Sequence, residues 1–263
     1  MLIPQPPLDM VVDKTPELYI TLVLASIAAG GVLLALLHWA RTRRPIVPLL
    51  FGAGGAMMVF EPLVDTVGGC WFPTNSYVAF EAYGRPMPVW LCLAYFFYFG
   101  IASATVWMSL KRGMTRNQIW IAFVVAMIGD LVFESILLIW KPYVYYGHQP
   151  MLLANGFAMW WMPVNALIPI VLGAIVYRFD DWFRGVRALA IVPIGLMTSA
   201  AVNASVGWPS WMVVNTDLGW LATQLGGVTT FVLAAAVVRV VAHFTASDAA
   251  MQMTSGAARP LSA

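Results

Sequence analysis

The chain has 263 residues, of which 61% are hydrophobic and only 10% are charged, and its mean hydropathy is +0.80. Globular domains carry about 25% charged residues, so this composition excludes a soluble domain and indicates an integral membrane protein. The small formal charge of +2 gives no sign of a nucleic-acid partner, and the absence of short alternating segments excludes a β-barrel.

Apolar stretches of roughly 20 residues, the length that crosses a bilayer, recur along the chain and predict an all-α bundle of seven transmembrane helices. We expect these helices at residues 18–38, 46–65, 88–110, 118–140, 151–177, 188–207 and 218–243. A segment at 1–17 precedes this single domain, without the basic region and cleavage site of a signal peptide. The tail at 244–263 is small and polar, and we expect it to be disordered.

The lysines and arginines predict the orientation of the bundle. Most of the 14 follow the first, third, fifth and seventh spans, whereas the opposite side carries only Lys14, Arg85 and Lys141. Positive residues stay on the cytoplasmic side. The sequence therefore predicts an outer N-terminus and a cytoplasmic C-terminus.

Two pairs of acids, each spaced by four residues, fall inside predicted spans. Glu61 and Asp65 lie at the end of the second span, and Asp130 and Glu134 lie in the fourth. Residues four apart share a helix face, and charge in a bilayer is costly enough that such acids usually face a bundle interior and have a function. Pro62 is expected to kink or end its helix. The alternative for Glu61 and Asp65 is a span that ends in headgroup water.

Other polar residues fall at a similar depth if each residue rises about 1.5 Å along its helix. We expect them to converge with the acids in the outer half of the bilayer: Tyr95, Tyr98, Asn165, Asn203, Asp217 and Gln224. The acids are the candidate catalytic residues, and Asp217 joins them as a base or charge stabiliser. The remaining residues are candidate substrate contacts. Hydrogen bonds that merely hold helices together are the alternative interpretation.

Aromatic side chains are abundant in the outer connections and in the spans. The connection at 66–87 contains Trp71 and Arg85, and Trp161 lies in the fifth span. This connection is either an interfacial belt or a lid over a cavity. We include these three residues among the candidate substrate contacts, since an aromatic pocket holds apolar ligands and stabilises cationic charge.

Several other chemistries find no support. The three histidines, His38, His148 and His243, lie at span ends or in a loop and form no metal cluster. Asp180 and Asp181 are best explained as a solvated turn. We expect neither a metal nor a cofactor.

The two cysteines, Cys70 and Cys92, lack metal-ligand spacing. They should lie toward the same membrane side, so the sequence permits a disulfide between them.

A stretch beginning Phe60-Glu61-Pro62-Leu63-Val64-Asp65 resembles the AveC spirocyclase family, bacterial integral membrane proteins of polyketide biosynthesis. The resemblance covers about forty residues and continues through these segments: Trp71-Phe72-Pro73, Phe80, Gly84-Arg85-Pro86-Met87-Pro88 and Tyr95. It implies spiroketal formation, with a linked dehydration, in a bacterial cytoplasmic membrane. A looser similarity to seven-span membrane terpene cyclases rests on the positions of Glu61 and Asp217 alone.

These features predict a metal-free cyclase that closes a ring in an apolar substrate by acid–base catalysis. Glu61 or Asp65 would be the general acid, with Asp217, Asp130 and Glu134 as base or charge stabiliser. A terpene cyclase that protonates an epoxide or alkene is one alternative. A proton-coupled transporter that uses the acids as a relay and a non-enzymatic lipid-binding or assembly protein are the others.

Overall fold

The protein is described by a computed structural model, which covers the backbone of residues 4–257 and side chains through residue 245. It is 70% helical and nearly all-α. The helices that form the bundle are α1 (Lys14–Thr42), α2 (Ile46–Ala56), α3 (Glu61–Gly68), α4 (Val89–Tyr95), α5 (Ala102–Lys111), α6 (Arg116–Leu138), α7 (Trp161–Arg178), α8 (Ile191–Val206), α9 (Trp208–Val214) and α10 (Trp220–Ala257). Shorter helical turns join some of them: η1 (Met57–Val59), η2 (Phe96–Ile101) and η3 (Gly185–Ala190).

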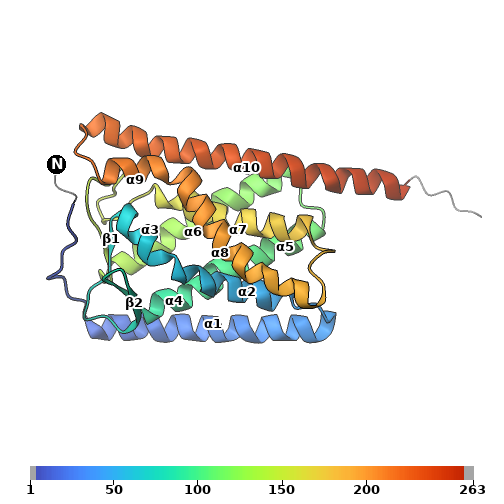
Figure 1. The fold of residues 1–263 in the computed structure, drawn as a ribbon, viewed down its shortest axis with the longest axis horizontal. Coiled ribbons are helices and arrows are strands. Elements are labelled where there is room, and N and C mark those ends of the chain that lie inside the picture. Colours follow the sequence, from blue (N-terminus) through green and yellow to red (C-terminus); the bar gives the residue numbers. More distant parts are fainter. Residues whose placement is uncertain (1–3, 258–263) are drawn as a thin grey trace, which may run out of the picture.

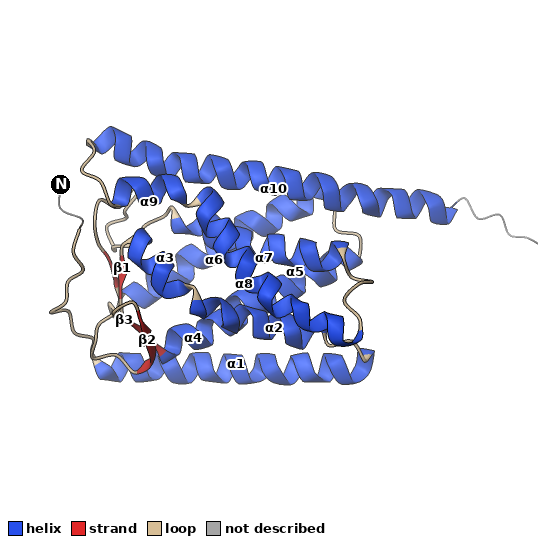
Figure 2. Ribbon diagram, viewed as in Figure 1, coloured by secondary structure: helices blue, strands red, loops and turns tan. Residues whose placement is uncertain are grey.

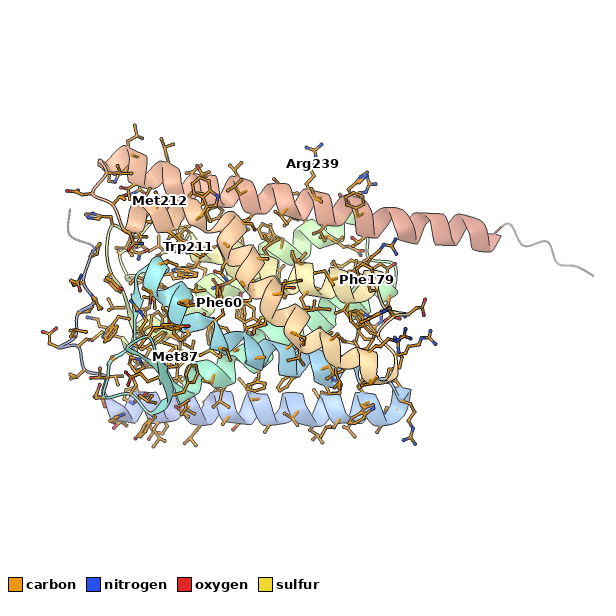
Figure 3. The ribbon with its side chains drawn as sticks, in the orientation of Figure 1. Phe60, Met87, Phe179, Trp211, Met212 and Arg239 are labelled. Carbon is orange, nitrogen blue, oxygen red and sulfur yellow. The ribbon has the colours of Figure 1, made fainter. Side chains whose placement is uncertain are left out.

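Six helical segments within the described residues are long and apolar enough to cross a membrane, and a bent pair makes a seventh if it is counted as one span. The bent pair is the second predicted span, in which 46–59 and 61–68 meet at 51°. Pro62 sits in the first turn after the bend, where its ring and missing N–H cannot continue a straight helix past Met58. The predicted kink is therefore confirmed. Phe60 lies at this bend, between α2 and α3 (Figure 3).

The fifth span is shorter than the sequence predicts. We expected it to begin at residue 151, but α7 begins at Trp161. The preceding ten residues form a loop in which Leu152 bridges to Ala158. Met151 and Gly156 have φ values of 55° and 90°, which no α-helix accommodates. Hydropathy did not show this break because the loop is itself apolar.

The last helix is longer than predicted. α10 continues to Ala257, beyond residue 243, where the sequence predicted the seventh span to end; the disorder expected for the tail stays a prediction. Residues 258–263 lie outside the described part of the chain. In Figure 1, α1 and α10 run along opposite edges of the view, and α10 extends beyond the other helices.

Four short strands gather at one end of the bundle (Figure 2), which we call the strand end. They are β1 (Cys70–Trp71), β2 (Val78–Ala82), β3 (Arg85–Pro88) and β4 (Val144–Tyr145). β1 pairs with β4, and β2 pairs with β3, both antiparallel. The long connection at 66–87 is thus an ordered cap. A fully buried Glu17 at the start of α1 accepts a 2.8 Å hydrogen bond from the Tyr77 backbone N–H and fastens this cap.

Small residues bring α2 and η2 into backbone contact in the middle of the bundle. A Cβ added at Gly54 would lie 2.5 Å from the backbone nitrogen of Gly100 and 2.7 Å from the carbonyl oxygen of Tyr95. Neither Gly54 nor Gly100 can therefore be replaced by a larger residue unless α2 and η2 move apart. The close contact between α2 and η2 fixes the position of the end of α4, and with it the side chain of Tyr95.

The opposite end of the bundle carries most of the basic residues, and we call it the basic end. Here Asp180 is buried, and its carboxylate accepts hydrogen bonds from Arg44 (2.7 Å), Lys111 (2.8 Å) and the indole of Trp107 (2.9 Å). The solvated-turn interpretation is therefore wrong for Asp180, although Asp181 is exposed and forms an ion pair with the exposed Arg184. Spacing along the chain could not reveal that helices far apart in sequence end around this one carboxylate.

Candidate functional site

A chamber near the strand end brings together all four acids of the two i, i+4 pairs. Glu61 and Asp65 come from α3, and Asp130 and Glu134 come from α6. The other residues that line it are Cys70, Phe72, Trp90, Leu91, Ala94, Tyr95, Tyr98, Phe99, Phe133, Leu137, Tyr143, Tyr145, Trp161 and Asn165. The predicted convergence of acids is confirmed for these two helices.

The acids on α3 and α6 are close enough to act on one another through space. Glu134 influences both Glu61 and Asp65 electrostatically, and Glu61 and Asp65 influence each other. Among the described residues, no lysine, arginine or histidine lines the chamber. The four carboxyl groups therefore share a low-dielectric space without a cation among the lining side chains.

Tyrosine hydroxyls take the place of cations as partners of the two glutamates. Tyr95 donates a hydrogen bond to Glu61, while Tyr143 and Tyr145 both donate to the same oxygen of Glu134. Burial first, and then the neighbouring Glu134, raises the pKa of Tyr143 and of Tyr145 well above the ordinary tyrosine value. Both phenols consequently keep their protons and remain donors.

Sequence reasoning missed Tyr143 and Tyr145 as site residues, because they lie in a connection between two predicted spans. A signal was present in their spacing. Residues two apart on a strand point to the same face, and β4 begins between them at Val144. The pairing of β4 with β1 then holds both rings over the end of α6.

Asp130 has a different partner. Both of its oxygens lie 3.3 Å from the side-chain nitrogen of Asn165 on α7. The hydroxyl of Tyr98 is close enough to influence Asp130, but it makes no hydrogen bond of standard geometry with any described residue. The predicted roles of Asn165 and Tyr98 as polar groups of the site are thus compatible with their positions.

The chamber wall on the α4 side contains a π-helix, η2. Such wide turns are rare and occur mostly at functional sites. Tyr95 precedes this turn, and Tyr98 and Phe99 belong to it; all three line the chamber. Their spacing of three and four residues puts these rings on one face of the helix.

Arg85 and Trp71 lie behind the chamber wall and are not among its lining residues. The buried Arg85 side chain donates to the hydroxyl of Thr66 (2.6 Å), to the Cys70 carbonyl and to the Tyr146 hydroxyl. Its guanidinium also lies over the Trp71 ring, 5.6 Å from the centroid. Direct substrate contact predicted for these two residues is not supported; Arg85 instead ties α3, β1 and the residue after β4 together as a roof.

Trp161 does line the chamber, as predicted. Its ring stacks on Trp160 with centroids 4.1 Å apart, and both rings pack against Gly68 at the end of α3. A Cβ at Gly68 would lie 2.3 Å from the Trp161 ring, so only glycine permits this wall to close. The indole pair therefore forms a rigid flat surface beside the acids.

The two cysteines are both free, so the disulfide that the sequence permitted is not formed. Cys70 lines the chamber beside Asp65, whereas Cys92 on α4 does not line it. Burial raises the pKa of the Cys70 thiol well above its ordinary value. The thiol is therefore protonated and unreactive as a nucleophile.

Three predicted site residues lie elsewhere. Asp217 is exposed in the connection between α9 and α10, Asn203 is buried on α8 and donates to the Ser199 carbonyl at 3.0 Å, and Gln224 accepts from the Met151 N–H at 2.8 Å. None of them lines the chamber. Similar depth along the helices did not predict which residues line the chamber, because depth does not determine the direction in which a side chain points.

The chamber is small. Its cavity volume is about 70 Å³, by a measure on which one water needs roughly 10–15 Å³. This space accepts a few water molecules or a small ring, and a larger ligand must displace side chains of the wall. Within the described residues, no group of three or more histidines, cysteines, aspartates or glutamates is arranged to hold a metal ion.

In comparisons with known proteins, no family model, curated protein or solved structure matches the chain.

Proposed function

We propose that this protein is a membrane-embedded cyclase that closes a ring in a small apolar substrate by acid–base catalysis. One observation carries the proposal: two pairs of carboxyl groups, on α3 and on α6, line one aromatic chamber that no basic side chain lines. Like charges at close range in a low-dielectric site cannot all ionise cheaply. Such a group of acids therefore retains both protons that it can donate and oxygens that can accept them.

The two glutamates provide the simplest division of roles. Glu61 protonates a carbonyl oxygen of the substrate while an acid on α6, Glu134 or Asp130, accepts the proton of the attacking hydroxyl. The new C–O bond closes the ring, and no net proton is consumed. Loss of water from the resulting hemiketal, followed by attack of a second hydroxyl, would complete a spiroketal. General acid–base catalysis of this kind contributes about 10²–10⁴-fold.

The walls contribute through shape and charge. Trp161, Trp90 and Phe72 present aromatic surfaces next to the acids, and such surfaces stabilise the positive charge that develops on the carbonyl carbon when the leaving water departs. A confined chain also brings its hydroxyl close to its carbonyl, for which large effective molarities are known.

The resemblance to the AveC spirocyclases is the reason for naming a spiroketal among the products. Four residues of the resembling segments, Glu61, Asp65, Phe72 and Tyr95, line the chamber. The terpene cyclase alternative required Glu61 and Asp217 to act on one substrate, and Asp217 does not line the chamber. In the proposed orientation the strand end faces outward and the basic end lies in the cytoplasm.

The test is conversion of a dihydroxyketone of matching size to its spiroketal by the purified protein in detergent, followed by chromatography and mass spectrometry. We expect Glu61→Gln to lower the rate by about 10²–10⁴-fold and to keep the folded state, as judged by its elution as a single species and its thermal transition.

Asp217→Asn is the matched control, since it neutralises an acid outside the chamber, and it should retain full activity. Full activity of Glu61→Gln would eliminate the proposal. Uptake in sealed vesicles that requires a pH gradient, with no product in detergent, would favour a proton-coupled transporter instead.

A further inference from the structure

A second space, unconnected with the acids, lies on the other face of the π-helix. It is a groove with a cavity volume of about 240 Å³, larger than the chamber, between α1, α2, η2 and α5. α1 packs against α2 and α4, but toward the basic end it stands away from α5 and leaves this groove. On the inner side of the groove, Gly31 of α1 packs closely against the Phe51 ring of α2, and a Cβ at this glycine would lie 2.6 Å from that ring.

The groove walls are apolar along almost their whole length. The two polar residues that line it are His38 and Thr105. Thr105 already donates its hydroxyl proton to the Ile101 carbonyl at 2.9 Å, and His38 lies edge-on to Trp107 with ring centroids 6.3 Å apart. Apolar walls of this kind match the hydrocarbon chain of a lipid.

Two arginines mark the end of the groove nearest the basic end. Arg41 follows His38 by three residues on α1, and Arg112 follows Met108 by four at the end of α5, so each arginine continues the helix face that lines the groove. Both are exposed, and neither has an ion-pair or hydrogen-bond partner among the described side chains. Lys111 beside them is engaged by Asp180.

We infer that this groove binds the acyl chain of an anionic phospholipid, whose phosphate lies between Arg41 and Arg112. Charge complementarity selects this occupant: the walls accept a hydrocarbon chain of any lipid, but two arginines at the mouth favour a headgroup with net negative charge. The inference does not depend on the cyclase proposal, because none of these residues lines the chamber.

Native mass spectrometry of the purified protein tests the inference. The probes are phosphatidylglycerol and phosphatidylcholine with identical acyl chains, supplied in equal amounts. We expect the anionic lipid to be retained several-fold more than the zwitterionic one. The double variant Arg41→Gln/Arg112→Gln should remove the preference, and Thr105→Trp, which fills the groove from an exposed position, should reduce retention of both lipids.

Two matched controls keep the result specific. Arg239→Gln removes an exposed arginine that projects away from the bundle on α10 (Figure 3), and Leu33→Trp adds bulk on an exposed face of α1 outside the groove. Neither should change lipid retention. Equal retention of the two lipids by the unchanged protein, or a preference that survives the double arginine variant, would overturn the inference, and so would a co-purified apolar molecule other than phospholipid that Thr105→Trp displaces.

Discussion

At the basic end, Asp180 receives hydrogen bonds from Arg44, Lys111 and Trp107. At the strand end, Glu134 receives them only from tyrosines, and one oxygen of Asp65 has no hydrogen-bond partner among the described residues. Both ends bury acids, but two cations hydrogen-bond directly to Asp180, whereas the hydrogen bonds to Glu61, Glu134 and Asp130 come from tyrosines and from Asn165. A carboxylate surrounded by cations is fixed in its charged form and acts as a structural anchor, whereas acids partnered by phenols and by one another remain able to exchange protons.

This comparison predicts that neutralising an acid lowers activity at the strand end but lowers stability at the basic end. Glu134→Gln should lower the cyclisation rate by about 10²–10⁴-fold and leave the thermal transition nearly unchanged, because the amide keeps the shape and still accepts from Tyr143 and Tyr145. The measurements are product formation and thermal unfolding in the same detergent. Asp180→Asn is the counterpart and should retain catalysis while the protein loses stability. An equal loss of activity in both variants would show that the two ends are not functionally distinct.

Backbone contact between α2 and η2 links the fold to the chamber, and its loss should have the next largest effect. Gly54→Ala would force α2 away from η2 and from Tyr95, at a cost of about 1–3 kcal/mol for overpacking, and would also lower activity because Tyr95 bonds to Glu61. Gly52→Ala in the same helix is the control, since a Cβ there meets nothing within 4 Å. It should be neutral or stabilise by up to about 1 kcal/mol. Thermal unfolding and product formation distinguish the two, and equal behaviour of both variants would contradict the packing argument.

The smallest predicted effect is the pH dependence of the stability that Asp180 contributes at the basic end. Burial alone would raise the pKa of Asp180, but hydrogen bonds from Arg44, Lys111 and Trp107 outweigh burial and hold the pKa below its ordinary value. A group with a lowered pKa in the folded state stabilises the protein above its unfolded pKa of about 3.9, and this stabilisation is lost as the pH falls through the folded value.

The unchanged protein should therefore be more stable than Asp180→Asn at neutral pH by about 1.5–3 kcal/mol, the range for hydrogen bonds to charged groups. The difference should shrink below about pH 4. Thermal unfolding of both proteins from neutral to acidic pH measures it, and a difference that persists unchanged at low pH would show that Asp180 acts through its shape rather than its charge.

Part of the site followed from the sequence because helix periodicity is a local property. The spacing of Glu61 with Asp65 and of Asp130 with Glu134 was sufficient to place each pair on one face, and burial of acids in an apolar span was sufficient to turn both faces inward. Depth along the helix was not sufficient for Asp217, Asn203 and Gln224, because a residue at the right height can still point to a neighbouring helix or to the surface.

Hydropathy and residue spacing were enough to predict helices long and apolar enough to cross a membrane, the bend before Pro62 and the two acid pairs, because hydropathy, ring geometry and helical spacing act over a few residues. Tertiary structure alone decided that Tyr143 and Tyr145 meet Glu134, that Asp180 is an anchor, and that Asp217 lies outside the chamber. These outcomes depend on how strands and helix ends distant in sequence pack together, and local propensities do not encode which of several polar partners a folded chain brings within hydrogen-bonding distance.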